Sequence, residues 1–233
     1  MNRLFISIVA FSMVLTLQSK AATTTSNDEE KAVVFTNEMY EALGSPYYCD
    51  VPEGTTELGY RAFFKCELFH FVTIPESVTK IGAEAFFSCD NITVIELPSK
   101  VTYIGEKAFQ YCDNMVEINI PKGVTVIDSY AFYSCDNLPA LDLPEGLTKI
   151  GDYAFYRGFA IETLTFPSTL QYIGESAYWG SEALRSVEIP SSLTHLGKDA
   201  FGSCEVLKEI KISASCPVYE QVVAEYGDIV VTQ

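Results

Sequence analysis

The chain has few of the side chains from which catalytic centres and zinc sites are built. It contains two histidines, His70 and His195, which lie far apart in the sequence. No Ser-His-Asp or Cys-His set can be assembled around either of them. No cysteines have the close spacing of zinc ligands, and no glycine-rich phosphate loop follows a strand pattern. We therefore expect a protein that is not an enzyme, with no catalytic residues, no metal site and no cofactor.

Basic residues are scarce as well. The chain has 15 Lys and Arg against 31 Asp and Glu, and its formal net charge is −16 at pH 7. An acidic surface repels nucleic-acid backbones and anionic membranes, so the charge excludes both as partners. It favours basic proteins or cations as partners, or a charge that serves solubility alone, which is the interpretation we prefer.

Long apolar runs are confined to the N-terminus. The basic stretch Met1-Asn2-Arg3 precedes an apolar run over residues 4–17, and Ser19-Lys20-Ala21 has the small-x-small pattern of a cleavage site. The run is shorter than the ~20 residues that span a bilayer. Residues 1–21 are therefore predicted to be a signal peptide, with an uncleaved anchor as the alternative. The mature protein is expected to be secreted or at the cell surface, without membrane insertion.

A 23-residue repeat fills most of the chain. Ile-Gly or Leu-Gly recurs in one register, as at Ile81-Gly82, and Ala followed by Phe or Tyr recurs in another, as at Ala85-Phe86. Proline marks the period of 23 residues at Pro52, Pro75, Pro98, Pro121, Pro144, Pro167 and Pro190. A fixed period of about 20–50 residues indicates one supersecondary unit stacked on copies of itself.

Each unit can be divided by its apolar spacing. A proline and a second extended piece follow an alternating strand, and a single helical turn such as 106–109 comes next. The fold class predicted is an α/β repeat solenoid, a right-handed stack of seven units with short strands and single helical turns. Residues 48–212 form the repeats, 22–47 an N-terminal cap and 213–233 a C-terminal cap. The first strand of the unit is expected at 94–97, 117–120, 140–143, 163–166, 186–189 and 209–212, and four phenylalanines are expected to be buried: Phe86, Phe109, Phe132 and Phe155.

The repeat resembles that of the BspA-like leucine-rich repeat family. Its form here is Leu-x-x-Ile-x-Ile-Pro-x-x-Val-Thr-x-Ile-Gly-x-x-Ala-Phe-x-x-Cys, over roughly residues 49–215. It departs from the common pattern Leu-x-x-Leu-x-Leu-x-x-Asn/Cys, because Lys100, Gly123 and Gly146 stand in the Asn/Cys position. The resemblance implies a leucine-rich-repeat-like solenoid. It also implies a surface or secreted protein that adheres to host matrix proteins or to other cells.

Five of the seven cysteines share one register of the repeat: Cys66, Cys89, Cys112, Cys135 and Cys204. Gly158 and Ser181 occupy the same register in the two remaining units. Stacked strands place equivalent residues ~5 Å apart, which is within the range of a disulfide. The alternative is a column of buried thiols, and we favour it because Gly and Ser interrupt the column without leaving paired neighbours.

Two faces of the predicted solenoid carry candidate protein-binding residues. Outward strand positions hold the carboxylates Glu96, Glu117, Asp142 and Glu188. The helical-turn face holds Tyr130, Tyr153, Tyr156, Arg157 and Phe159. Tyrosine and arginine are enriched at protein interfaces. Phe159 either packs over the space left by Gly158 or stays exposed in a Tyr-Arg-Phe cluster.

Acidic residues recur in a further register, among them Asp90, Asp113 and Asp136. Turn chemistry explains aspartate at these positions as well as a bound cation does.

These features together predict a non-catalytic module that binds a protein partner, and the resemblance implies adhesion or contact with a host or cell-surface protein. One alternative is a glycan-binding module that uses the tyrosine-rich face, and it requires exposed, coplanar aromatic rings. Another is a structural repeat module without a single ligand.

Overall fold

The structure is a computed structural model, and it describes residues 32–44, 47–66, 70–139 and 141–233. The predicted signal peptide and the part of the predicted N-terminal cap before residue 32 lie outside the described residues. Within the described ranges, no helix combines the length and the apolarity that a membrane crossing requires.

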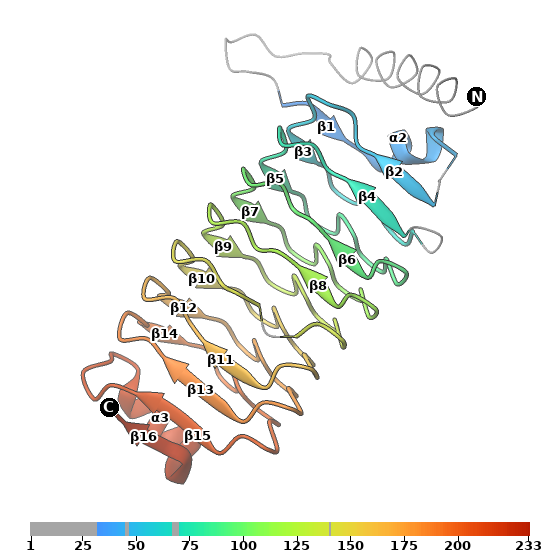
Figure 1. The fold of residues 1–233 in the computed structure, drawn as a ribbon. Helices are drawn as coiled ribbons and strands as arrows, with labels where there is room; N and C mark the ends of the chain where they lie inside the picture. The colour runs from blue at the N-terminus through green and yellow to red at the C-terminus, as the bar shows by residue number, and fades with distance from the viewer. Residues whose placement is uncertain (1–31, 45–46, 67–69, 140) are drawn as a thin grey trace.

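The chain winds into an elongated stack of coils with parallel strands on two sides (Figure 1). One side is an eight-stranded sheet, in which neighbouring repeats pair in parallel with partners 23 residues apart, as Lys80 does with Tyr103. Its strands, in spatial order, are β1 (Val34–Phe35), β3 (Glu57–Leu58), β5 (Lys80–Ile81), β7 (Tyr103–Ile104), β9 (Val126–Ile127), β10 (Lys149–Ile150), β12 (Tyr172–Ile173) and β14 (His195–Leu196). The predicted repeat solenoid is confirmed.

The other side, which we call the strand face, is divided into three smaller sheets. They are β2 (Tyr48–Asp50) with β4 (Phe71–Thr73), β6 (Val94–Ile95) with β8 (Glu117–Ile118), and the four-stranded set β11 (Thr163–Thr165), β13 (Ser186–Ile189), β15 (Glu209–Ile212) and β16 (Val230–Thr232). The strand predicted over 140–143 is not formed, because residues 141–143 have no strand structure. Pro139 explains the interruption. Its equivalent Val116 donates its N–H to the Thr93 carbonyl at 2.8 Å, and proline has no N–H to donate.

Both ends of the stack continue its packing. At the N-terminal end, β1 pairs with β3 in the repeat register, so the repeat begins within the predicted cap, and the short helix α2 (Asn37–Ala42) follows it. At the C-terminal end, the helix α3 (Tyr219–Tyr226) and the 3-10 turn η1 (Gly227–Ile229) lead into β16. The Tyr226 ring lies 6.0 Å from that of Phe201, so α3 packs against the last repeat.

The segments predicted as single helical turns are instead pairs of tight turns. Lys107 and Tyr111 have φ angles of 57° and 62°, in the left-handed region that a right-handed helical turn does not contain. Alternate N–H groups bond to the next repeat, as Phe109 does to the Ala131 carbonyl at 2.8 Å, while Ala108 bonds within its own turn to Gly105 at 3.1 Å. These inter-repeat bonds offset the roughly 1–2 kcal/mol that a left-handed residue costs.

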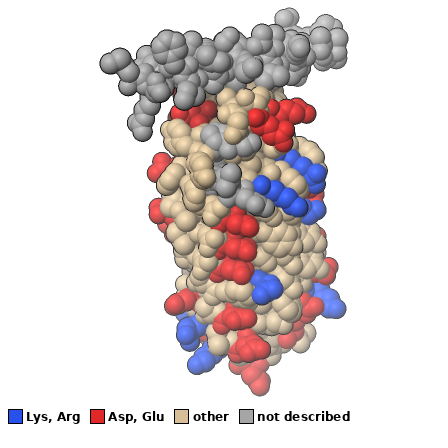
Figure 2. Space-filling view, turned by 90° about the vertical axis from the view of Figure 1, so that its right-hand side faces the viewer, with Lys and Arg blue, Asp and Glu red and all other residues tan. Residues whose placement is uncertain are grey.

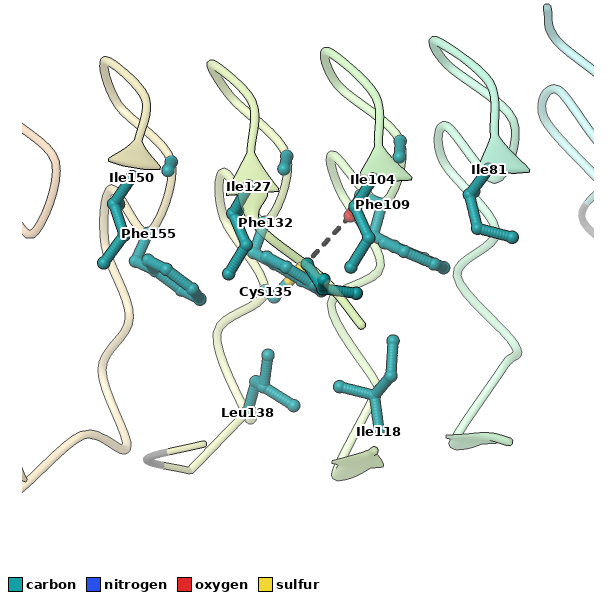
Figure 3. Close-up of a cluster of buried hydrophobic side chains, with 14 of the residues drawn as sticks. Ile81, Ile104, Phe109, Ile118, Ile127, Phe132, Cys135, Leu138, Ile150 and Phe155 are labelled. Atoms are coloured by element: carbon teal, nitrogen blue, oxygen red, sulfur yellow. Dashed lines mark hydrogen bonds between the residues drawn. The ribbon is translucent and has the colours of Figure 1, made fainter. Parts of the chain in front are cut away.

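The core consists of columns of identical side chains (Figure 3). The rings of Phe86, Phe109, Phe132 and Phe155 stack at centroid separations of 5.2 Å. Their exposed fractions are 0%, 0%, 1% and 4%, so the predicted burial is confirmed. Isoleucines of the eight-stranded sheet, such as Ile104 and Ile127, form a second column beside them.

Four of the five cysteines in the shared register are buried and Cys204 is half-buried, in line with the thiol column that we favoured, and all seven cysteines are free thiols. Each thiol in its interior donates to a backbone carbonyl of the preceding repeat. Cys112 donates to Phe86 O at 3.1 Å. Cys135 donates to Phe109 O at 3.1 Å, the dashed line in Figure 3. Burial raises the pKa of Cys112 to about 12, which keeps this thiol protonated and weakly nucleophilic.

Candidate protein-binding surface

The turns position the candidate aromatic and basic residues through unusual backbone geometry. Tyr130, Tyr153 and Arg157 have φ angles of 60°, 57° and 61°, and none of them is glycine. Each is fixed by a hydrogen bond to the next repeat: Tyr130 N–H to Asp152 O at 2.9 Å, Tyr153 N–H to Glu175 O at 2.8 Å, and Arg157 N–H to Trp179 O at 2.8 Å. The backbone of this surface is therefore held rigidly by the stack.

Five aromatic residues on these turns pack into one cluster, which we call the aromatic patch: Tyr130, Tyr133, Tyr153, Tyr156 and Trp179. Tyr130 stacks on Tyr153 with centroids 4.9 Å apart. Tyr133 stacks on Tyr156 at 4.7 Å, and Tyr156 on Trp179 at 4.8 Å. All five side chains are half-buried. Because the rings cover one another face to face, the patch presents mainly ring edges and hydroxyl groups to solvent.

Phe159 does not fill the space beside Gly158. A β-carbon on Gly158 would lie 2.7 Å from Ile161 Cδ1, so Ile161 occupies that space. Phe159 is half-buried, and the guanidinium of Arg157 lies over its ring, 4.8 Å from the centroid. Phe159 and Arg157 thus form a surface pair next to the aromatic patch.

An acidic column, Asp90, Asp113 and Asp136, lies close to this pair. Asp113 is exposed, yet partial desolvation of its carboxyl raises its pKa most, the Asp136 and Asp90 carboxylates raise it further, and Arg157 lowers it. Burial also raises the pKa of Tyr133, and Arg157 again opposes the change. The guanidinium therefore acts on both the aromatic patch and the acidic column. Figure 2 shows acidic side chains following one another along one face, with a basic side chain beyond them.

Turn chemistry accounts for part of the acidic column. Asn114 donates its side-chain amide to Asp90 O at 2.7 Å, and Asn137 donates to Asp113 O at 2.7 Å. Within the part of the chain that the structure describes, no group of three or more His, Cys, Asp and Glu is placed to hold a metal ion.

The carboxylates predicted on the strand face, Glu96, Glu117, Asp142 and Glu188, are all exposed. Glu188 lies in register with Thr165 of β11 and Lys211 of β15. These carboxylates belong to a different side of the solenoid from the turns. The nine candidate residues therefore divide into two separate surfaces.

Three further residues belong to the surface around the candidates. Tyr133 and Trp179 share their register with Phe64 and Phe87, which are half-buried as well, and their rings extend the stacks of the aromatic patch. Lys107 lies 5.4 Å from the Tyr130 ring centroid. Its position one repeat before Tyr130 was the signal in the sequence that could have identified it.

The two histidines lie on aromatic neighbours rather than beside a nucleophile. His195 stacks on Tyr172 with ring centroids 4.3 Å apart. His70 lies 6.1 Å from Tyr47 and 6.4 Å from Phe71, measured between centroids. Neither histidine lies in the aromatic patch.

Comparison with solved structures places the fold among bacterial leucine-rich repeat proteins. A leucine-rich cell surface protein from Faecalibacterium prausnitzii A2-165 is 32% identical, with a TM-score of 0.66 over 71% of this chain and 47% of that one. A leucine-rich repeat protein from Bacteroides ovatus is 20% identical, with a TM-score of 0.66 over 80% of this chain and 53% of that one. The chain thus spans about half the length of these two proteins. The leucine-rich repeat protein of T. pallidum is 23% identical, with a TM-score of 0.57 over 81% of this chain and 87% of that one.

No curated protein matches the chain. The family model described as BspA type leucine-rich repeat region matches it in six copies, over residues 36–157 and 103–223. These ranges include the phenylalanine column, the thiol column and the aromatic patch. The chain belongs to the BspA-type leucine-rich repeat family.

Proposed function

We propose that this protein is a secreted or cell-surface module that binds another protein without catalysis, and that it serves in adhesion or contact with a host or cell-surface protein. The observation that supports the proposal is the aromatic patch with the Arg157–Phe159 pair at its edge. Tyrosine, tryptophan and arginine are the residues most enriched among those that dominate binding energy at protein interfaces.

The rigidity of the patch favours tight binding. The inter-repeat hydrogen bonds and the ring stacking fix its side chains before a partner arrives. Ordering a flexible side chain on binding costs roughly 0.5–1.5 kcal/mol, so a surface that is already ordered avoids this loss. Its edges and hydroxyls suit a protein surface that offers both apolar and hydrogen-bonding groups.

The charge around the patch indicates that the partner's binding surface is basic. The acidic column lies beside Arg157. Desolvation raises the pKa of Asp113 most, and the carboxylates of Asp136 and Asp90 add a repulsion that a basic side chain would relieve. Lysine or arginine of a partner placed over this column would therefore add to the contact made by the aromatic residues.

The stacking of the rings argues against the glycan alternative. A sugar ring packs against an exposed aromatic face, whereas Tyr153 and Tyr156 turn their faces toward neighbouring rings. The similarity to a cell surface protein of Faecalibacterium prausnitzii supports the proposed location, as does the signal-peptide pattern of residues 1–21.

The experiment is a binding assay of the mature protein against extracellular matrix proteins and a glycan array in parallel. The test variant is Arg157→Glu. The matched control is Lys65→Glu, because Lys65 is exposed, lies in the same register of the repeat and has a similar φ angle of 55°. We expect a matrix or cell-surface protein to bind the wild type and Lys65→Glu but not Arg157→Glu. Binding to glycans alone would support the glycan alternative, and binding to neither class would support a structural module.

A further inference from the structure

The strand face is interrupted at the repeat that contains residues 141–143. β8 and β11 border the interruption, and residues 141–143 lie between them without strand structure. No backbone hydrogen bond joins residues 141–143 to either strand among the described residues. The neighbouring repeats keep such bonds, for example from Arg185 N–H to Glu162 O at 2.8 Å.

A pocket of about 330 Å³ opens at this interruption. Its walls are inward-facing side chains of the two repeats: Leu141, Leu143, Phe155, Ile161, Leu164 and Phe166. Leu141 and Leu143 are only half-buried, whereas their equivalents Leu164 and Phe166 in the next repeat are buried, so the repeat with Leu141 leaves open a space that the next repeat fills. The pocket is in the size range of sites that hold small ligands or single large side chains.

Tyr178 lines the pocket and is the polar exception in the phenylalanine column. Its ring stacks on Phe155 at 5.0 Å, and 1% of the residue is exposed. The hydroxyl forms no hydrogen bond with a described residue, and burial alone raises its pKa above the ordinary value. The hydroxyl is not among the fully buried polar atoms that lack a partner, so it keeps access to the pocket that Tyr178 lines.

The rim of the pocket is acidic and polar. Asp142 and Glu145 supply two carboxylates, and Thr163 and Thr165 of β11 supply hydroxyls. All four residues are exposed, and the pocket therefore opens on the strand face. A ligand that enters it meets carboxylates at the mouth, an apolar wall and one hydroxyl group inside.

We infer that this pocket binds a tryptophan side chain of a partner protein, flanked by lysine or arginine. An indole has an apolar body and one N–H donor, which matches the apolar wall and the unpaired Tyr178 oxygen. The flanking cations match Asp142 and Glu145 at the rim. Because its occupant is a segment of a protein, the site presupposes the proposed protein-binding role, but it lies on the strand face and uses none of the aromatic patch.

The probe for this site is the peptide acetyl-Lys-Trp-Lys-amide, titrated into the mature protein and followed by NMR of the methyl groups. Acetyl-Lys-Ala-Lys-amide tests the need for the indole, and acetyl-Glu-Trp-Glu-amide tests the need for the cations. We expect saturable shifts of the Leu141, Leu143, Ile161 and Leu164 methyls with the first peptide alone. Absence of shifts, or shifts confined to other methyls, would overturn the inference.

The variant Tyr178→Phe separates hydrogen bonding from folding, because phenylalanine occupies the same position in the repeats on either side. We expect this variant to fold and to bind the Lys-Trp-Lys peptide about fivefold or more weakly than the wild type does. Tyr172→Phe is the matched control, since Tyr172 lies on the eight-stranded sheet, and it should leave the affinity unchanged. Equal affinity of Tyr178→Phe and wild type would exclude the assigned role of the hydroxyl.

The two proposals fail in different ways. If a captured protein is lost with Arg157→Glu while no peptide enters the pocket, the pocket is not a site and the aromatic patch remains the binding surface. If the peptide binds but no protein is captured, the pocket is a competent site and the proposed function is wrong.

Discussion

The Cδ1 atom of Ile161 lies 2.7 Å from the position that a β-carbon on Gly158 would take. Gly158 stands in the thiol column, where the preceding repeat has Cys135, and Ile161 stands where that repeat has Leu138. Isoleucine and leucine have the same number of side-chain carbons, but the end of Ile161 reaches the space next to position 158 that the Gly158 side chain leaves free. Ile161 thus fills the space that the Gly158 side chain leaves, and Phe159 lies at the surface instead.

Gly158→Cys should therefore overfill the core. The new side chain meets the end of Ile161, and overpacking of this kind costs about 1–3 kcal/mol of unfolding free energy, measured by urea denaturation. The double variant Gly158→Cys with Ile161→Leu recreates the Cys135–Leu138 pair and should recover most of the loss. A neutral Gly158→Cys would show that the two side chains do not share this space.

The Arg157–Phe159 pair should contribute to binding far more than to folding. The double variant Phe159→Ala with Arg157→Ala is expected to weaken binding of the partner protein by about 1 kcal/mol or more. That is the threshold at which interface residues become energetically important. The melting temperature should change little, because both side chains lie at the surface. Affinity by titration calorimetry and melting by circular dichroism test the two parts. A large loss of stability with unchanged affinity would assign the pair to packing.

The phenylalanine column should dominate stability. Phe109→Ala removes a fully buried ring that stacks on Phe86 and Phe132, and we expect a loss of about 3–5 kcal/mol in unfolding free energy. Tyr111→Ala, two positions away and 38% exposed, is the comparison and should cost much less. Chemical denaturation of both variants measures the difference, and similar losses would contradict the assignment of Phe109 to the core.

The thiol column should remain reduced and unreactive in the native protein. Burial raises the pKa of Cys112 to about 12, so the thiolate that attacks a disulfide reagent is scarce. Titration of the mature protein with such a reagent should find five or more free thiols after denaturation and far fewer before it. Recovery of two or three disulfides between successive repeats would contradict the hydrogen-bonded column.

The sequence predicts the repeated parts of this structure and not the places where the repeat fails. Phe109 and Cys112 recur with period 23, so the burial of their columns follows from stacking alone. The left-handed backbone at Lys107 has no signature in a single repeat, because lysine there gains its compensation only from the N–H bonds to the next repeat. The pocket beside Tyr178 escaped prediction in the same way. Pro139 removes a hydrogen bond toward the repeat of β8, whereas the pocket opens on the other side of residues 141–143, toward β11, and neither effect is visible in one repeat alone.

Asp113 should oppose folding at neutral pH. Its pKa is raised in the folded state by burial, then by Asp136 and Asp90, so its favourable contribution belongs to the protonated form. That contribution is present below the unfolded-state pKa of about 3.9 and is lost as the pH rises through the folded-state value. Asp113→Asn should therefore raise the melting temperature at pH 7, and the gain should vanish near pH 3.

The neighbouring Arg157 sharpens this test. Since Arg157 opposes the rise in the pKa of Asp113, its removal should increase the repulsion within the acidic column. Asp113→Asn should then stabilise the protein more in an Arg157→Ala background than in the wild type at pH 7. Asp142→Asn makes the same change of charge outside the column and serves as the control, because Asp142 lies on the strand face. A gain for Asp113→Asn that persists unchanged to pH 3, or one that Asp142→Asn reproduces, would show that the effect comes from net charge and not from the column.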